Sequence, residues 1–263
     1  MGLLEDIKND SRLKDIKITE SNLLLFSRYL DELDNCKGCR GLEKCKNGYN
    51  GMTPFIINNN EIGRRPCKYL IAERRKDNVN PLFDDTYLKD ASLSDFKTDT
   101  LPRQKLAQYA NELLAGSEKK GLYLCGPIAS GKTYFLSLLA NELAKKDIKS
   151  TIVFVPDLSR KLKGSIAQGK LEEMVEMLKT TEVLMLDDLG GEMFTSWLRD
   201  EILLPVLQYR YVNNKLTFIS SNMTFEQLEA HFANEAEEGS DLKANRILQR
   251  IRKMTTRVVF ASK

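Results

Sequence analysis

Short apolar runs alternate with longer helical patterns from about residue 101 to the end of the chain. The apolar runs predict strands at residues 121–125, 150–156, 182–188, 215–221 and 256–260. The segments between them predict helices at residues 103–115, 132–146, 157–180 and 195–213. Strands that alternate with helices are typical of a parallel sheet that is covered on both faces. The pattern therefore predicts an α/β domain built on a parallel five-stranded sheet.

The first hundred residues follow a different pattern. Residues 1–35 carry a leucine-rich helical stripe, and residues 68–76 predict a short helix. Residues 36–67 hold four cysteines and five glycines, which is typical of a small loop-rich module. A polar stretch that follows predicts a linker whose last part packs onto the next domain. We therefore expect a small helical, cysteine-containing domain at residues 1–75, a linker at 76–100 and the α/β domain at 101–263.

The charge balance excludes a chain that is basic throughout. Its 263 residues include 40 Lys and Arg against 37 Asp and Glu, so the net charge is only +3. A nucleic-acid site must therefore come from local clustering of basic residues. The chain has no apolar run of about 18 residues, the length that predicts a membrane span, and its first residues lack the pattern of a secretory signal. We expect a cytoplasmic protein with no membrane partner.

A phosphate-binding loop follows the strand predicted at residues 121–125. Its eight residues match the G-x-x-x-x-G-K-T pattern: Gly126, Pro127, Ile128, Ala129, Ser130, Gly131, Lys132 and Thr133. The backbone N–H groups of such a loop surround a phosphate chain, and the helix that follows directs its positive end toward the same place. Lys132 is expected to reach the β- and γ-phosphates, and Thr133 to bind Mg²⁺. The sequence thus predicts an ATP site.

Two carboxylates end the strand predicted at residues 182–188. Asp187 is expected to hold Mg²⁺, directly or through water. Asp188 is placed to polarise the attacking water, a position where many ATPases carry glutamate. Because aspartate is shorter by one methylene group, we expect slow hydrolysis. An aspartate pair that merely begins a turn is the plainer alternative, and the phosphate-binding loop upstream argues against it.

A third polar group, Ser220-Ser221-Asn222, ends the strand predicted at residues 215–221. A side chain at this place can sense the γ-phosphate or orient water, and we favour Asn222. The alternative is that these residues cap the next helix, and the two interpretations are compatible.

The segment from Arg246 to the end carries six basic residues and no acidic one. Arg246 and Arg250 lie four residues apart and so share a helix face. Arginine is suited to reach a γ-phosphate across a subunit boundary, and equally suited to bind DNA phosphates. A solvated basic face is the simpler alternative.

Four of the five cysteines lie within 32 residues of one another. Cys36, Cys39 and Cys45 form a C-x2-C-x5-C cluster, and Cys67 is the obvious fourth member. Zinc takes four ligands in structural sites, and a module with so few apolar side chains needs an additional stabilising element. We therefore expect these four cysteines to bind Zn²⁺, with free thiols as the alternative. Cys125 fits simple core packing.

Four motifs, GPIASGKT, VLMLDDLGGE, SSN and NRILQRIR, occur here in an order and spacing that resemble a known family. This family is the DnaI/DnaC group of AAA+ ATPases, which load the bacterial replicative helicase. The resemblance covers about residues 95–263. The cysteine module of residues 1–75 resembles the zinc-binding, helicase-docking domain of the DnaI branch, although that family can use histidine where this chain offers Cys67.

The resemblance implies a primosome component that binds the hexameric replicative helicase through its N-terminal domain. Such proteins self-associate through their AAA+ domains and use ATP to place the helicase ring on single-stranded DNA. Lys132, Thr133, Asp187, Asp188 and Asn222 carry over as the nucleotide site. Arg246 or Arg250 carries over as the arginine finger, and Arg246 is the preferred of the two.

Three alternatives to a helicase loader follow from the same residues. The first is the ATP-binding helper of a transposase, which shares the ATPase clade but normally lacks a cysteine module. The second is a regulator that binds duplex DNA, for which the chain offers no place for a helix-turn-helix domain. The third is a metabolic P-loop kinase, for which no acceptor pocket or lid can be identified. The zinc content of the protein therefore discriminates best between a helicase loader and a transposase helper.

Overall fold

The computed structural model describes residues 3–78, 91–117, 120–192, 195–233 and 238–260. The chain divides into two compact units, Met1–Arg74 and Arg75–Lys263. Each unit has a hydrophobic core of its own.

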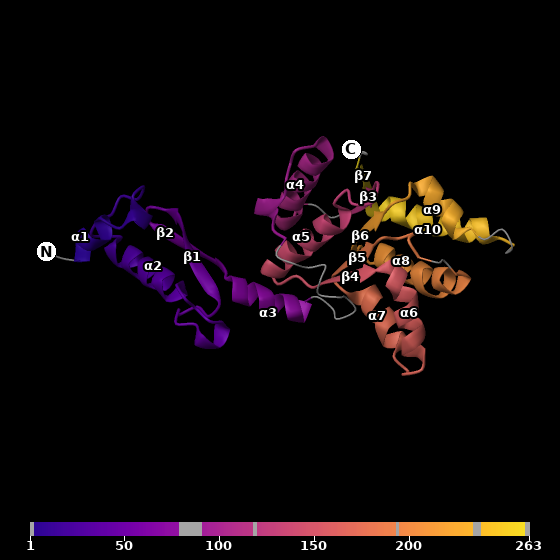
Figure 1. Ribbon diagram of the computed structural model, residues 1–263, viewed down its shortest axis with the longest axis horizontal. Helices are drawn as coiled ribbons and strands as arrows, with labels where there is room; N and C mark the ends of the chain where they lie inside the picture. Colours follow the sequence, from indigo (N-terminus) through magenta and orange to yellow (C-terminus); the bar gives the residue numbers. More distant parts are fainter. Residues whose placement is uncertain (1–2, 79–90, 118–119, 193–194, 234–237, 261–263) are drawn as a thin grey trace. The chain divides into compact units, whose positions relative to one another are not determined.

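The second unit is built on a five-stranded sheet in which every pair of neighbouring strands is parallel (Figure 1). The order across the sheet is β4-β5-β6-β3-β7. The strands are β3 (Gly121–Cys125), β4 (Ser150–Phe154), β5 (Val183–Asp187), β6 (Leu216–Ser221) and β7 (Thr255–Val259). The predicted parallel five-stranded sheet is confirmed. The strand predicted at 150–156 ends earlier because Pro156 lies in the first turn of the next helix, where its missing N–H costs no hydrogen bond.

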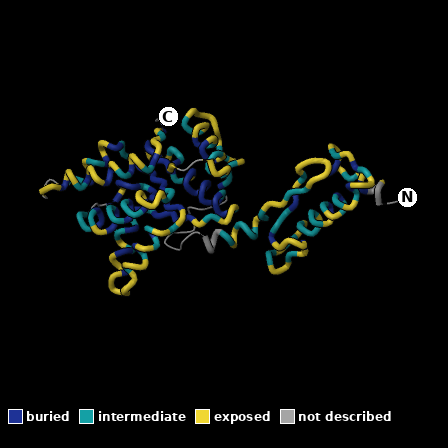
Figure 2. The backbone as a smooth tube through the Cα atoms, turned by 180° about the vertical axis from the view of Figure 1, so that it is seen from behind, coloured by how far each residue is buried: buried dark blue, intermediate teal, exposed yellow. Residues whose placement is uncertain are grey.

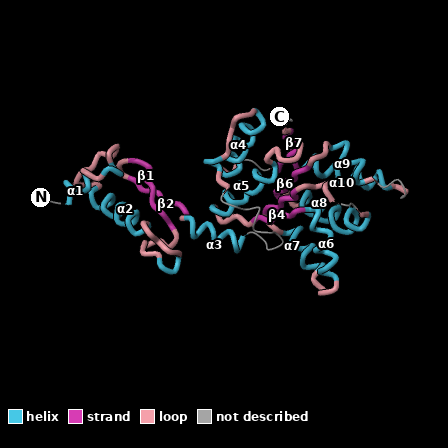
Figure 3. Tube along the Cα trace, viewed as in Figure 1, coloured by secondary structure: helices cyan, strands magenta, loops and turns pink. Residues whose placement is uncertain are grey.

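Helices cover both faces of this sheet (Figure 3). They are α4 (Leu101–Leu114), α5 (Lys132–Lys145), α6 (Val155–Ile166), α7 (Leu171–Thr180), α8 (Leu204–Val212), α9 (Phe225–Phe232) and α10 (Ser240–Met254). Apolar side chains of α4 and α5 pack on one face, and those of α6 to α10 pack on the other. Both faces therefore exclude water, which explains why the strands are apolar throughout.

Successive residues of β3 show how the two cores divide the sheet. Leu122 and Leu124 join the core beneath α4 and α5, whereas Tyr123 and Cys125 join the opposite core. All four are at most 3% exposed, and the dark-blue trace of Figure 2 follows these buried strands. A fully buried leucine contributes about 2 kcal/mol to folding. The phosphate-binding loop thus begins at the end of a strand that is fixed on both sides.

Residues 91–96 are part of this unit's core. The side chains of Ala91, Leu93 and Phe96 pack with the α4–α5 core. Asn141 on α5 donates a hydrogen bond to the carbonyl oxygen of Ala91 at 2.8 Å, and Glu142 accepts one from the N–H of Leu93 at 3.1 Å. Residues 79–90 of the expected linker lie outside the described residues.

The helix predicted at residues 195–213 is not continuous. Leu198–Leu203 form a π-helical turn, and α8 begins only at Leu204. Pro205 has no N–H to donate to the preceding turn, which accounts for the irregular hydrogen bonding there. Arg199 in the π turn is fully buried, and its guanidinium donates to the Asp200 carboxylate and to the hydroxyl of Ser240. This arginine joins the π turn to the start of α10.

Arg210 on α8 is fully buried and donates mainly to the backbone. Its guanidinium binds the carbonyl oxygens of Leu178, Thr181 and Leu216 at 3.2, 2.8 and 2.7 Å. It also donates to the hydroxyl of Thr217 at 2.9 Å. Burial lowers the pKa of Arg210 to about 9, so the side chain is still charged at neutral pH. Arg210 therefore ties the end of α7 to the starts of β5 and β6.

The first unit is a small mixed α/β structure. Its elements are α1 (Leu3–Lys8), a 3₁₀ turn (Ser11–Leu13), α2 (Leu23–Cys36), a second 3₁₀ turn (Leu42–Lys44), β1 (Met52–Asn58), β2 (Glu61–Pro66) and α3 (Lys68–Asn78), in which the boundary to the second unit falls. The strands β1 and β2 form an antiparallel hairpin. Phe26 and Leu30 of α2 lie in a core with Leu13, and Ile56 and Ile62 of the hairpin pack against it.

Two predictions for the first unit were wrong in part. Residues 14–22 are not helical, because the Asn22 side chain holds this segment by accepting from the N–H of Thr19 and donating to the carbonyl oxygens of Lys17 and Asn59. The hairpin was missed, because the cysteines and glycines around it indicated loops. No helix in the described ranges is long and apolar enough to cross a bilayer.

Candidate nucleotide-binding site

The phosphate-binding loop connects β3 to α5, as the sequence predicts. Gly126 leaves the strand with a φ of 155°, and a side-chain Cβ here would lie 2.7 Å from that of Phe260 and 2.8 Å from its carbonyl oxygen. The backbone at Phe260 donates to the carbonyl oxygen of Cys125 at 2.7 Å, which holds the end of β7 against the loop. Only glycine allows this close approach, so the first glycine of the motif is explained by packing as well as by the turn.

Lys132 begins α5, and its ammonium is directed back into the loop. Its Nζ donates to the carbonyl oxygens of Gly126 and Pro127 at 2.7 and 2.8 Å and to Oδ1 of Asn222 at 2.8 Å. Burial lowers the pKa of Lys132, while the charges of Asp188 and Asp187 oppose that shift. The three acceptors are uncharged oxygens. A phosphate group that displaced them would give the ammonium a negatively charged acceptor and so a stronger hydrogen bond.

Asp187 is the last residue of β5 and is 1% exposed. Its carboxylate accepts hydrogen bonds from the hydroxyl of Thr133, at 3.0 Å to each oxygen, and from that of Ser220 at 2.5 Å. Burial raises the pKa of Asp187, and the two hydroxyl donors oppose it. A buried carboxylate beside a threonine hydroxyl offers the hard oxygen ligands that Mg²⁺ prefers, so the predicted pair fits this ion.

Asp188 lies beyond the strand with a left-handed backbone, at φ 58°. Its Oδ1 accepts from Nδ2 of Asn222 at 2.9 Å. Burial raises its pKa, Lys132 lowers it, and the carboxylate of Glu192 raises it. A Cβ on Gly191 would lie 2.3 Å from Oδ2 of Asp188, so glycine at that position makes room for the carboxylate.

These side chains surround one cavity of about 230 Å³. The cavity is lined by Ile128, Ala129, Lys132, Thr133, Phe154, Asp187, Asp188, Ser220 and Asn222. An ammonium, two hydroxyls, two carboxylates and a carboxamide therefore belong to the residues that line the same space. The arrangement can hold a phosphate chain with Mg²⁺ at one end and a polarised water beside it.

The structure places Arg246 and Arg250 away from this cavity, on α10. Arg250 is partly buried, and it donates to the side chain of Gln208 and, at 2.7 Å, to the carbonyl oxygen of Arg246. Arg246 is exposed. Neither side chain is among those that line the nucleotide cavity of its own chain.

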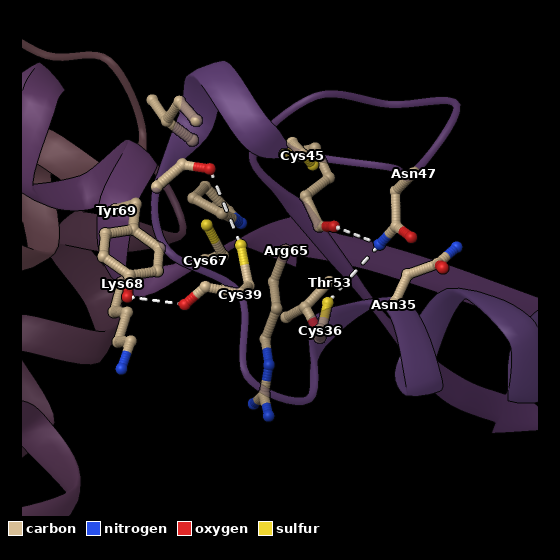
Figure 4. Close-up of a pocket in the computed structure, with 14 residues that line it drawn as sticks. Asn35, Cys36, Cys39, Cys45, Asn47, Thr53, Arg65, Cys67, Lys68 and Tyr69 are labelled. Carbon is tan, nitrogen blue, oxygen red and sulfur yellow. Dashed lines mark hydrogen bonds between the residues drawn. The ribbon is translucent and has the colours of Figure 1, made fainter.

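The four clustered cysteines line a second cavity, in the first unit, of about 320 Å³ (Figure 4). Cys36 and Cys39 come from the end of α2 and the loop after it, Cys45 follows a 3₁₀ turn, and Cys67 follows β2. The sulfur of Cys36 accepts from the side-chain amide of Asn47 at 3.4 Å. The sulfur of Cys45 accepts from the N–H of Gly51 at 3.5 Å. N–H donors of this kind are typical of the hydrogen bonds that surround and orient metal ligands.

The chemistry of this second cavity fits zinc, but the predicted four-ligand arrangement is not formed. Across residues 3–78 and the other described ranges, no group of three or more Cys, His, Asp or Glu side chains is arranged to hold a metal ion. The four thiols are free, and each is partly exposed. The fold thus brings together the predicted cysteines around one space without placing their sulfurs in a tetrahedron.

Sequence reasoning missed three contributors to the nucleotide site. The sequence marks Ser220 only as one member of a polar group. It indicates no role for Gly191, and it places Phe154 in a strand without any sign of a cavity beside it. Phe154 pairs in register with Asp187 across β4 and β5, which places it at the cavity. A register of this kind depends on strand order, which the sequence does not state.

The parallel sheet, the phosphate-binding loop and the paired carboxylates together define an ATP-binding P-loop protein of the AAA+ class. A family model described as IstB-like ATP binding protein matches residues 74–258. The replicative helicase loader DnaI of Bacillus subtilis (strain 168) is 34% identical over 257 residues, which cover 93% of this chain and 83% of that protein. The chain belongs to the IstB-like ATP-binding family and is a homologue of the DnaI helicase loaders.

Two solved structures agree with this assignment. A crystal structure of DnaI superposes with a TM-score of 0.63 at 38% identity, covering 72% of this chain and 98% of that chain. The crystal structure of the DnaC helicase loader superposes with a TM-score of 0.54 at 25% identity, covering 68% of this chain and all of that chain.

Proposed function

We propose that this protein is an ATP-dependent loader that places the replicative DNA helicase on single-stranded DNA during replication initiation or restart, as a component of the primosome. The observation that carries the proposal is the match to the DnaI loader over 93% of the chain, which extends through both compact units. A relative that matched only the second unit would support ATP binding but not the role of a helicase loader. The cytoplasm, where helicase and DNA meet, is the proposed place of action.

The nucleotide site supports a switch that depends on ATP and Mg²⁺. Lys132 and the loop N–H groups bind the phosphates, and Thr133 with Asp187 holds Mg²⁺, which when bound neutralises charge on the phosphates. Asp188 accepts a proton from the attacking water, and Asn222 orients that water or senses the γ-phosphate. The short Asp188 side chain favours slow hydrolysis, in which the bound state of the nucleotide controls assembly more than it supplies energy.

The cysteine cavity of the first unit is proposed to bind one structural Zn²⁺ through Cys36, Cys39, Cys45 and Cys67. The shared cavity and the N–H donors to two sulfurs support this proposal. Binding requires the four sulfurs to converge to about 2.3 Å from the ion. Elemental analysis of purified protein should give one zinc per chain, and substitution of Cys39 by serine should remove it.

Self-association is proposed to complete the nucleotide site. Arg246 is exposed on α10, whereas Arg250 is engaged by Gln208 within its own chain. Arg246 is therefore the better placed to reach the γ-phosphate of a neighbouring subunit as an arginine finger.

The units have separate proposed roles. Residues 1–75 dock on the hexameric helicase, residues 76–100 link, and residues 101–263 form the AAA+ ATPase that also contacts single-stranded DNA. The decisive experiment is co-purification with the replicative helicase by size exclusion and light scattering, with and without ATP. The loader proposal expects a stable complex with full-length protein and loss of that complex when residues 1–75 are removed.

The remaining candidate is the ATP-binding helper of a transposase, for which the second unit alone, the part matched by the IstB-like family model, would suffice. No complex with the helicase under any nucleotide condition would make this candidate the better one. Retention of the helicase by residues 95–263 alone would overturn the docking role of the first unit.

A further inference from the structure

The hydroxyl of Ser220 contacts both acidic residues of the nucleotide site. Ser220 lies one residue before the end of β6, beside β5, and is 1% exposed. Its Oγ donates to Oδ1 of Asp187 at 2.5 Å and accepts from the backbone N–H of Asp188 at 2.9 Å.

The direction of these two hydrogen bonds is fixed by chemistry. The N–H of Asp188 can only donate, so the serine oxygen must accept from it. The hydroxyl has a single proton, which is then directed at the Asp187 carboxylate. A buried hydroxyl whose proton has one direction holds its acceptor in one orientation. A hydroxyl in solvent rotates freely and does not do so.

We propose that Ser220 is a positioning residue for the magnesium site. The serine holds Oδ1 of Asp187, so the carboxylate keeps the orientation in which both of its oxygens lie 3.0 Å from the Thr133 hydroxyl. The same serine oxygen holds the backbone of Asp188 in its left-handed turn. This inference rests on the Mg²⁺–ATP role proposed above and names a residue that prepares that site.

The adjacent serine provides a matched control. Ser221 is also fully buried, and its hydroxyl donates to the carbonyl oxygen of Leu189 at 2.6 Å and accepts from the N–H of Met223 at 3.1 Å. It lies on the same strand as Ser220 and has two backbone partners of its own, neither of which belongs to Asp187 or Asp188. A loss of stability is expected from either serine, whereas a changed Mg²⁺ requirement is expected from Ser220 alone.

The test uses the full chain and a fluorescent ATP analogue. The concentration of Mg²⁺ that gives half of the Mg²⁺-dependent gain in analogue affinity is measured for wild type, Ser220→Ala and Ser221→Ala, together with Tm. Removal of a group that orients a metal ligand typically costs 10- to 100-fold in metal affinity, so Ser220→Ala should raise the requirement about tenfold. Ser221→Ala should stay within about twofold of wild type, since it touches no ligand. Analogue affinity in EDTA should be alike in all three.

Two further variants keep the result interpretable. Ser220→Cys retains the side-chain volume but donates weakly, so it should shift the Mg²⁺ requirement in the same direction. Ser220→Thr retains the hydroxyl and should bring the requirement back toward wild type. An unchanged requirement in Ser220→Ala or Ser220→Cys, or an equal shift in Ser221→Ala, would overturn the inference. A wild-type chain that binds the analogue equally in Mg²⁺ and in EDTA would instead overturn the proposed Mg²⁺–ATP role itself.

Discussion

The ammonium of Lys132 lies 2.8 Å from the side-chain oxygen of Asn222, which joins the start of α5 to the end of β6. The amide nitrogen of the same asparagine donates to Asp188 at 2.9 Å. Asn222 therefore connects the lysine of the phosphate-binding loop with the second carboxylate of the site. A γ-phosphate entering the cavity must compete for the same ammonium, so its arrival changes the hydrogen bonds of all three side chains.

Lys132→Ala should abolish detectable binding of an ATP analogue. The variant loses the only ammonium that lines the described cavity, and no other cation replaces it there. Isothermal titration with an ATP analogue and Mg²⁺ measures the effect, with Lys145→Ala on the same helix as the control. An unchanged affinity of Lys132→Ala for the ATP analogue would contradict nucleotide binding at the phosphate-binding loop.

Asn222→Ala should retain nucleotide binding and lose hydrolysis. Lys132 keeps its own charge, but Asp188 loses its side-chain donor and the water loses its orienting group. Removal of one preorganised polar group of this kind typically lowers kcat by about 10²–10³. Steady-state phosphate release and analogue affinity are measured on the same preparation. A fall in affinity as large as the fall in kcat would show that Asn222 serves binding and not hydrolysis.

Asp187→Asn should stabilise the nucleotide-free protein at neutral pH. Burial raises the pKa of Asp187 above its ordinary value of 3.8, so the folded state binds the proton more tightly than the unfolded state. The ionised carboxylate thus costs stability at neutral pH, and this cost shrinks as the pH falls through the raised pKa and is gone below the ordinary value of 3.8.

Thermal melts from about pH 7.5 down to about pH 4, close to the ordinary pKa, measure this effect. The Tm advantage of Asp187→Asn over wild type should be largest at the higher pH and should shrink as the pH falls. Asp157→Asn is the control, because Arg160 lowers the pKa of that exposed carboxylate and its loss should not stabilise. An advantage of Asp187→Asn that grows on acidification would contradict the assignment.

Arg210→Met should destabilise the second unit strongly. The substitution keeps the apolar part of the side chain but leaves several buried carbonyl oxygens without a donor. Losses of this kind cost about 3–5 kcal/mol, which corresponds to a fall in Tm of roughly 10 °C. Arg160→Met, whose side chain is 75% exposed, should stay within about 0.5 kcal/mol of wild type. Equal effects from the two substitutions would show that the buried arginine contributes little.

Arg246→Ala should lower hydrolysis about 10³-fold without changing nucleotide affinity, as expected for a finger that acts across a subunit boundary. Arg250→Ala should mainly lower Tm, because its guanidinium binds Gln208 in its own chain. Mixing Arg246→Ala with Asp188→Asn should restore part of the activity, since a mixed interface contains one intact site. No recovery on mixing would exclude action in trans.

Much of the second unit could be predicted from sequence because its information is local. The short apolar run at residues 121–125 indicates a buried strand by its own composition. The loop motif that follows indicates the turn that it forms. The left-handed turn at Asp188 and the role of Gly191 could not be predicted, because each depends on a side chain and a backbone meeting in space. The contacts of the Ser220 hydroxyl could not be predicted for the same reason, because β5 and β6 are distant in sequence and become neighbours only in the sheet.

The first unit was harder to predict for a different reason. Its strands β1 and β2 are largely half exposed or exposed, so no fully apolar run marks them. The core depends on contacts between α2 and the hairpin, and Phe26 of α2 precedes Ile56 and Ile62 of the hairpin by 30 and 36 residues in the sequence. The four cysteines that the pattern groups together line one cavity, but a spacing pattern carries no information on how closely the sulfurs approach.

The backbone at Asp188 also limits how this site can diverge over evolution. Aspartate and glutamate codons differ only at the third base, so the exchange that would lengthen the carboxylate is always one mutation away. A left-handed φ of 58° is tolerated by aspartate, asparagine and glycine far better than by longer side chains. The carboxylate is already so close to Gly191 that even a methyl group there would collide with it. A lineage that lengthened this carboxylate would therefore also have to accommodate it in the turn, so the side chain at this position is inherited together with the shape of the main chain.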